Sequence, residues 1–217
     1  MTEAILVIEE AWRAGISNDN DNVLRFIINQ QLAYGSDEGV FIETRNVSGL
    51  KSRLYTGEKI QTQLAAKNIL TLEAARALLL SKSRADYVSE CIHRVDKWIQ
   101  RQCFSEFCST GECKHSTVSY MRYLSAKESQ AKLAGLLSEL VKHRDGNGSW
   151  KGFPYFYTLL ALSDIHNPDA EKELEYAFPM MQKRFRRNQI EEPYWSRRND
   201  IMNRIQTRLN HILSIFI

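Results

Sequence analysis

No apolar run in this sequence approaches the roughly 20 residues that a helix needs to cross a bilayer. The sequence also lacks the basic stretch that opens a secretory signal peptide. Its first residues, MTEAILVIEEAWRAG, carry acidic residues inside an apolar pattern, which is typical of an amphipathic helix. With only four cysteines and no such signal, we expect reduced thiols, no membrane partner and a cytoplasmic location.

The motifs of the commonest enzyme classes are missing as well. There is no glycine-rich loop that would cradle phosphate, no G-x-S-x-G turn and no HExxH motif. Cys113 and His115 are close in sequence, but loop residues two apart rarely face each other as a nucleophile and its base must. We therefore expect no catalytic residues, and the sequence favours a non-catalytic protein.

The net charge of +3 is too small to imply a nucleic-acid partner. Its distribution is uneven, because residues 181–217 hold eight Lys and Arg against three Asp and Glu, a balance of +5 that leaves −2 for the remainder. The candidate polyanion-binding residues in this segment are Arg184, Arg186, Arg187, Arg197 and Arg198. A solvated helix face is the favoured interpretation, and a surface that binds nucleic acid is the alternative.

Apolar residues recur every three or four positions through most of the chain, as they do in amphipathic helices. The clearest stripe consists of Val88, Cys91, Ile92, Val95 and Ile99. Residues 60–79 predict one long or two short helices, and the weakly periodic segment 43–57 predicts a loop or a short β-hairpin. The whole pattern predicts an all-α chain of roughly nine or ten helices.

The stretch 133–165 predicts two helices joined by a glycine-rich turn. The segment 145–148, Asp-Gly-Asn-Gly, ends the first helix because glycine readily adopts the positive φ of such a turn. Residues 153–165 are apolar nearly all round, which predicts a fully buried helix. A further helix should begin at Asn167-Pro168, and Pro179 should kink it.

Three segments share one order: a helix, a polar stretch rich in Asp, Gly or Glu, an aromatic residue or Cys, and then another helix. They are residues 26–41, 95–113 and 136–153. Aligned on Phe41, Cys113 and Trp150, they are separated by 72 and 37 residues. A period in the high thirties to forties, doubled at one join, is what stacked helix pairs produce.

This pattern resembles the repeat of the terpenoid cyclases and protein prenyltransferases, in which a glutamine is followed by a Gly-Trp or Gly-Phe turn. The matching residues are Gln30 or Gln31 with Gly39 and Phe41, and Gly148 with Trp150. The resemblance covers residues 23–165. It implies helix pairs arranged as an α/α toroid, an isoprenoid-like or other apolar substrate and, in the prenyltransferases, a bound zinc ion.

The chain departs from that family in its catalytic motifs, since it has neither an Asp-rich acid motif nor an Asp-x-Cys zinc motif. It is also short for a closed toroid of six helix pairs. We therefore expect stacked antiparallel helix pairs that form a partial toroid, or an open arc of the HEAT kind, which has a similar period. A single domain, 1–217, is expected, with the basic part 168–217 packed on the repeat region 20–165.

The candidate metal ligands are Cys103, Cys108, Cys113 and His115. Zinc takes four such ligands in a tetrahedron. Here two intervals of four intervening residues separate the cysteines, which is wide for paired zinc ligands. Buried reduced thiols are the favoured interpretation, and a zinc site and a labile Cys108–Cys113 disulfide are the alternatives.

The candidate ligand-binding residues are the aromatics Trp150, Phe153, Tyr155 and Tyr157. They could line an apolar cavity, although aromatics at helical spacing are more often plain core. The leading hypothesis is a non-catalytic helical-repeat module that binds an apolar small molecule or a protein partner. The alternatives are a zinc-dependent enzyme on an apolar substrate and a HEAT-like binder of nucleic acid.

Overall fold

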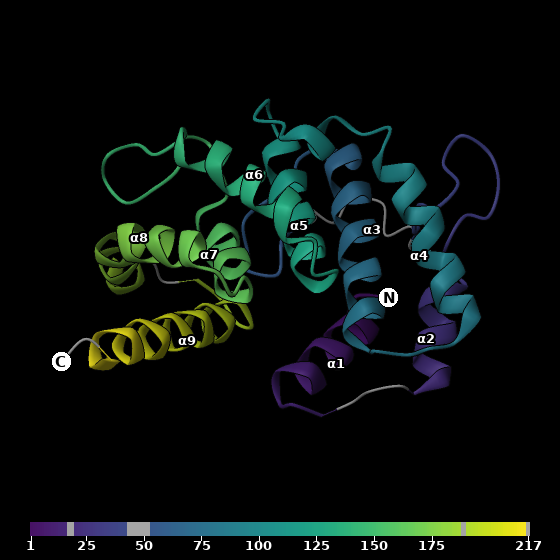
Figure 1. The fold of residues 1–217 in the computed structure, drawn as a ribbon, viewed down its shortest axis with the longest axis horizontal. Coiled ribbons are helices and arrows are strands. Elements are labelled where there is room, and N and C mark those ends of the chain that lie inside the picture. Colours follow the sequence, from purple (N-terminus) through teal and green to yellow (C-terminus); the bar gives the residue numbers. More distant parts are fainter. Residues whose placement is uncertain (17–19, 43–52, 188–189, 216–217) are drawn as a thin grey trace. The chain divides into compact units, whose positions relative to one another are not determined.

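The computed structural model describes residues 1–16, 20–42, 53–187 and 190–215, with side chains described up to residue 210 (Figure 1). In these ranges the helices are α1 (Thr2–Arg13), α2 (Asp21–Ile28), α3 (Gln63–Leu80), α4 (Asp86–Ile99), the 3-10 helix η1 (Cys103–Glu106), α5 (Cys113–Ala126), α6 (Gln130–Val141), α7 (Tyr155–Asp164), α8 (Pro168–Arg187) and α9 (Tyr194–Ile215). Extended residues pair there only in isolated bridges, so the all-α prediction is confirmed. Within the same ranges no helix combines the length and the apolarity that crossing a bilayer requires.

The helix boundaries follow the apolar stripes. Residues 60–79 belong mainly to a single helix, α3, and α8 begins at Pro168 as expected. Pro179 lies inside α8, and the kink expected there stays a prediction. Of the weakly periodic segment 43–57, residues 43–52 lie outside the described part of the chain, and Arg53 pairs with Lys59 in an isolated antiparallel bridge.

The chain divides into two compact units. The first comprises residues 1–50 and 61–129, and the second comprises residues 51–60 and 130–217. The short segment 51–60 therefore belongs with the C-terminal half, although it precedes α3 in the sequence. The expected single domain, with residues 168–217 packed on residues 20–165, stays a prediction. The expected stacking of helix pairs into a partial toroid or an open arc also stays a prediction.

The centre of the first unit is α3, which packs against α1, α4 and α5. Its buried alanines are Ala65, Ala74, Ala75 and Ala77. Because each of these side chains is a single methyl group, neighbouring helices can approach α3 closely. α3 thus contributes both small alanines and larger apolar residues, such as Leu72 and Leu78, to the core of this unit.

Buried charges also join three helices of this unit. Glu9 of α1, Arg76 of α3 and Arg122 of α5 are exposed by only 2%, 1% and 1%. Glu9 accepts hydrogen bonds from both Arg76 and Arg122, the latter at 3.0 Å, and Glu73 forms an ion pair with Arg122. The two buried guanidinium groups are thus each paired with a carboxylate, which a buried cluster requires because an unpaired buried charge is strongly destabilising.

The centre of the second unit is α7, which packs against α8 and α9. All ten of its residues are buried, as the apolar pattern of 153–165 predicts. Its N-terminus meets a carboxylate from the segment 51–60, because Glu58 accepts the backbone N–H groups of Phe156 at 2.7 Å and Tyr157 at 3.1 Å. A negative charge at this end satisfies free backbone donors and complements the helix dipole.

The glycine-rich turn between α6 and α7 is closed by Asp145. Its Oδ1 atom accepts the backbone N–H groups of Asn147 at 2.8 Å and Ser149 at 3.0 Å. Gly148 has a φ of +86°, and a Cβ added there would lie 2.8 Å from the Cβ of Met180. The turn therefore requires glycine at 148 both for its backbone conformation and for the close approach of α8.

Two of the three segments aligned in the sequence share a turn geometry. Gln31 pairs with Phe41, and Arg144 pairs with Trp150, each in an isolated antiparallel bridge. Each bridge begins three residues after the preceding helix ends, at Ile28 in α2 and Val141 in α6. The shared geometry agrees with the alignment of these two segments, while the repeat as a whole stays a prediction.

Candidate metal centre

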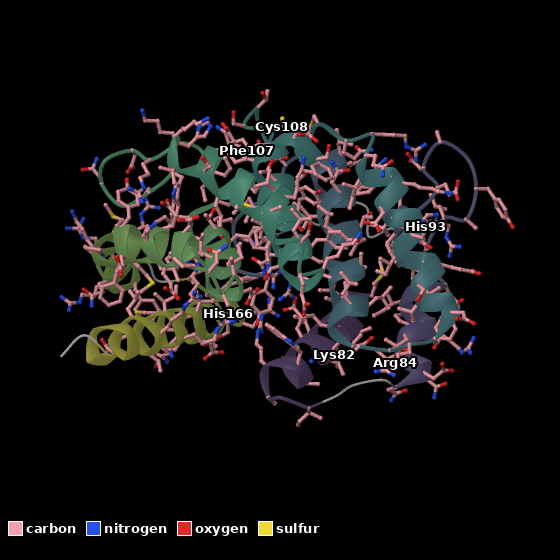
Figure 2. All side chains as sticks on the ribbon, in the orientation of Figure 1. Lys82, Arg84, His93, Phe107, Cys108 and His166 are labelled. Atoms are coloured by element: carbon pink, nitrogen blue, oxygen red, sulfur yellow. The ribbon has the colours of Figure 1, made fainter. Side chains whose placement is uncertain are left out.

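Three cysteines lie around the loop that joins η1 to α5. Cys103 is the first residue of η1, Cys113 is the first residue of α5, and Cys108 lies in the loop between them. Phe107 precedes Cys108 with a φ of 73°, and Gly111 follows with a φ of +49° (Figure 2). A positive φ is costly for a bulky residue such as Phe and is characteristic of sites where the backbone is held in a special conformation.

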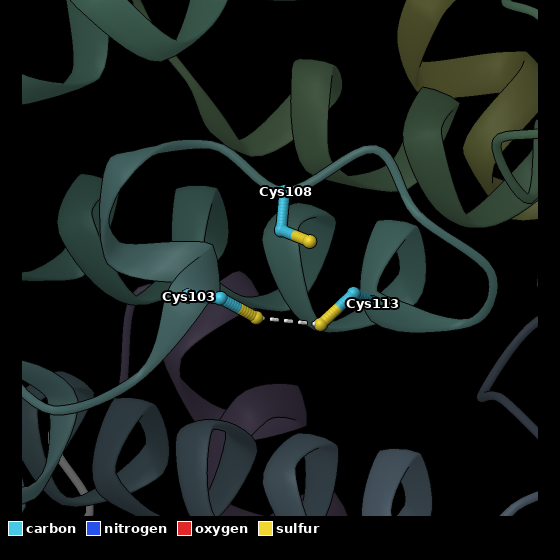
Figure 3. A group of neighbouring side chains, drawn as sticks. All are labelled: Cys103, Cys108 and Cys113. Carbon is cyan, nitrogen blue, oxygen red and sulfur yellow. Dashed lines mark hydrogen bonds between the residues drawn. The ribbon is translucent and has the colours of Figure 1, made fainter.

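The thiols of these cysteines point toward one another (Figure 3). Their three Sγ atoms all lie within 4.8 Å of one another, and those of Cys103 and Cys113 are 3.0 Å apart. In a tetrahedral zinc site the sulfurs stand about 3.8 Å apart, because each lies about 2.3 Å from the ion. Small side-chain movements would therefore bring all three sulfurs to the distances that a zinc ion requires.

The thiols differ in their exposure and in their acidity. Cys103 is exposed, whereas Cys108 and Cys113 are partly buried. Burial acts to raise the pKa of Cys108, but hydrogen bonds from Thr110 and from the neighbouring thiols outweigh it, and the pKa falls below its ordinary value. Burial and the neighbouring sulfurs raise the pKa of Cys113. One thiolate thus opposes the ionisation of its neighbour, and a bound cation would remove that repulsion.

Several groups hold this arrangement in place. Thr117, a buried residue of α5, donates a hydrogen bond to the carbonyl of Cys108 at 2.8 Å and accepts the N–H of the same residue at 3.2 Å. Cys113 is the first residue of α5, so its backbone position is set by the start of that helix. The hydrogen bonds from Thr110 to Cys108 are of the kind that orient metal ligands from outside the coordination shell.

Glu112 connects the same loop to the start of α3. Its carboxylate accepts the N–H groups of Gln61 and Thr62 and the hydroxyl of Thr62, each at 2.7 Å. Both carboxylate oxygens are therefore used in this connection, and Glu112 is not arranged as a metal ligand. These hydrogen bonds fix the position of Glu112, which immediately precedes Cys113.

Of the four metal ligands that the sequence suggests, the structure brings together three. His115 is not part of the group that could hold an ion among the described residues, and its charge contributes instead to lowering the pKa of Glu112. His93, on α4, lies well away from Cys108 (Figure 2). Cys91, also on α4, is fully buried, and burial raises the pKa of its thiol to about 12. The predicted His115 ligand therefore does not join the three thiols.

The four aromatic residues predicted to line a ligand cavity belong to the core of the second unit. Trp150, Phe153, Tyr155 and Tyr157 are exposed by 2%, 7%, 5% and 1%. The indole N–H of Trp150 donates to Glu173 at 2.8 Å, and the hydroxyl of Tyr155 donates to the carbonyl of Ala177 at 3.1 Å. This is the plain-core arrangement, which the sequence already favoured for aromatics at helical spacing.

The five arginines predicted to bind a polyanion have different surroundings. Arg198 is buried, donates to the carbonyl of Thr56 at 2.8 Å and lies 4.0 Å from the centroid of the Phe156 ring. It therefore does not belong to an exposed basic surface. Arg197 donates to the carbonyl of Tyr55 at 3.2 Å.

The remaining three lie in the last turns of α8. Arg186 and Arg187 are exposed. Arg184 is partly buried, donates to the hydroxyl of Ser149 at 3.0 Å and lies 4.1 Å from the centroid of the Tyr155 ring. Of the five arginines, Arg186 and Arg187 are thus the exposed ones, and both the solvated helix face and the polyanion-binding surface stay predictions.

The sequence pattern did not reveal the polar residues that make long-range contacts in the fold. Glu58 caps the start of α7 and Glu112 holds the two residues that precede α3, and no local spacing indicates contacts between segments so far apart in the chain. The buried charges of α1 and α3, in contrast, could have been suspected from the sequence. Glu9 follows Ile8, and Arg76 follows Ala75, so each charge adjoins an apolar core position of its helix.

Comparison of the chain with protein-family models, with curated proteins and with solved structures found no match. The resemblance to the terpenoid cyclases and protein prenyltransferases therefore stays a prediction. The candidate function has to be argued from the cysteines themselves.

Proposed function

We propose that the chain is a non-catalytic helical protein that binds a soft metal ion, with zinc as the leading candidate, through the thiolates of Cys103, Cys108 and Cys113. The observation that carries the proposal is the convergence of three sulfur atoms within 4.8 Å at a partly exposed loop. Three thiols seldom gather at a surface for packing alone, because a thiol on the outside contributes little to a hydrophobic core.

The donor set favours a soft ion. Thiolates select zinc, monovalent copper and iron–sulfur clusters over hard ions such as magnesium and calcium, which prefer oxygen ligands. The two intervals of four residues, which are wide for a short zinc knuckle, suit ligands placed at the starts of two separate helices, η1 and α5. The cation would also relieve the repulsion that raises the pKa of Cys113.

This proposal keeps the binding role expected from the sequence and changes its ligand. The aromatic residues expected to hold an apolar molecule are buried and paired within their own unit. As part of the proposal we place the chain in the cytoplasm, where a reducing environment keeps thiols available to a metal.

The test is metal analysis of the reduced protein after it has been incubated with zinc and freed of excess ion. We expect about one zinc per chain. Replacing Cys108 with Ser should remove stoichiometric binding, because it leaves only two thiolates. Circular dichroism of each variant would show that its helix content is unchanged.

The matched control is Cys91→Ala, which removes a thiol from the same unit but outside the group. This variant should bind zinc as the parent does. Failure of the parent protein to retain zinc, or full retention by Cys108→Ser, would contradict the proposed function.

A further inference from the structure

Two of the three thiols are already in contact. The Sγ atoms of Cys103 and Cys113 lie 3.0 Å apart, although the residues are ten positions apart in the chain. Cys103 is exposed, so a small molecule in solution can reach its sulfur. A proximal pair with one accessible member is the arrangement of cysteines that respond to oxidation.

We propose that Cys103 and Cys113 form a disulfide bond when the protein meets an oxidised low-molecular-weight disulfide, and that Cys108 remains reduced. The pair differs from the Cys108–Cys113 bridge that the sequence suggests. This modification goes beyond metal binding, because it requires only the two thiols and an external disulfide.

The chemistry is ordinary thiol–disulfide exchange in two steps. The thiolate of Cys103 attacks one sulfur of the external disulfide, forms a mixed disulfide and displaces one small thiolate. The thiolate of Cys113 then attacks the Cys103 sulfur, the protein S–S bond forms and a second small thiolate leaves. The external disulfide takes up two electrons, and the two protons of the protein thiols end on the released small thiols.

Geometry favours this pair over one that contains Cys108. Cys103 and Cys113 need the least movement to reach bonding distance, and the backbone of Cys108 is held by two hydrogen bonds to Thr117.

The Cys103–Cys113 disulfide would also affect the proposed metal site. Only this effect rests on the proposed function. A disulfide between Cys103 and Cys113 removes two of the three thiolates. Since metal ions bind thiolates and not disulfides, oxidation would release the ion.

The experiment treats metal-free and zinc-loaded protein with oxidised glutathione and follows intact mass, peptide mapping and free zinc. In the metal-free protein we expect a loss of about 2 Da, from the two hydrogens removed, and a peptide that links Cys103 to Cys113. Cys108→Ser should form the same link, whereas Cys103→Ser should not. In the zinc-loaded protein, about one zinc should appear in solution for each bond formed.

Three results would overturn the inference: a link that involves Cys108, a stable adduct with one glutathione, or no reaction in the metal-free protein. These outcomes are independent of the metal. If zinc never binds but the Cys103–Cys113 link forms, the proposed function fails and this inference stands.

Discussion

Glu9 in the first unit is a buried charge that requires partners of opposite charge. Its carboxylate is exposed by 2% and lies between two arginines exposed by 1% each. Removing a charged group from water is unfavourable, and the pairing with the buried Arg76 and Arg122 helps to compensate for it. The same carboxylate also accepts a hydrogen bond from Arg13 at 2.9 Å. One residue of α1 thus contacts arginines on three different helices, α1 itself included.

The first prediction concerns this residue. Glu9→Gln keeps the size of the side chain but removes the negative charge that pairs with the buried Arg76 and Arg122, so the free energy of unfolding should fall by about 3 kcal/mol. Urea unfolding monitored by circular dichroism measures the change. Glu10→Gln, at an exposed neighbour on the same helix, should stay within about 0.5 kcal/mol of the parent. Equal effects of the two substitutions would show that the buried cluster does not stabilise the unit.

At the scale of elements, what distinguishes this chain is how its turns and helix ends are held. The α6–α7 turn depends on Asp145 and on a glycine pressed against α8. The N-termini of α7 and α3 depend on Glu58 and Glu112, which come from other segments of the same units. Tertiary contacts of this kind stabilise helices in proteins more than intrinsic helix propensity does.

Two glycines of the α6–α7 turn provide a matched pair for the second prediction. Gly146 and Gly148 have φ values of +82° and +86°, but only a Cβ at 148 meets other atoms closely. Gly146→Ala and Gly148→Ala should therefore share the cost of a positive φ, and Gly148→Ala should lose about 1–3 kcal/mol more from overpacking against Met180. Thermal unfolding of both variants checks this. Similar losses of unfolding free energy in the two variants would mean that close packing of α8 against residue 148 does not constrain the turn.

The third prediction is a pH dependence that belongs to Glu112. Burial acts to raise its pKa, but hydrogen bonds from Thr62 and Gln61 outweigh it, so the folded pKa lies below the model-peptide value of 4.5. The contribution to stability is therefore present above about pH 4.5 and is lost as the pH falls through the folded pKa. Unfolding measured at several pH values should show a shallower acid dependence for Glu112→Gln than for the parent. Glu10→Gln is the control, and identical profiles for the parent and Glu112→Gln would contradict a stabilising role for Glu112 before the start of α3.

At the scale of the whole molecule, periodicity predicted the helices and little of what lies between them. The stripe through Val88 and Ile99 marks α4, and the apolar run 153–165 marks the buried helix α7, because both signals are local. Glu58 contacts residues 98 and 99 positions away, and such pairings leave no trace in local spacing.

The candidate site was only partly visible in the sequence for the same reason. Spacing alone gave four ligand candidates, and it could not exclude His115, because the direction of each side chain depends on the loop backbone. That backbone includes a positive φ at Phe107, a residue type that gives no signal for such a conformation. The sequence therefore named the three thiols but not the geometry that brings them together.

The measurement that tests the central proposal most directly is X-ray absorption at the zinc edge of the reduced, zinc-loaded protein. Three thiolate ligands predict three sulfur atoms at about 2.3 Å in the first coordination shell, and two after Cys108→Ser wherever zinc is retained. A first shell made only of nitrogen and oxygen, or one unchanged by that substitution, would show that Cys103, Cys108 and Cys113 do not form the metal centre.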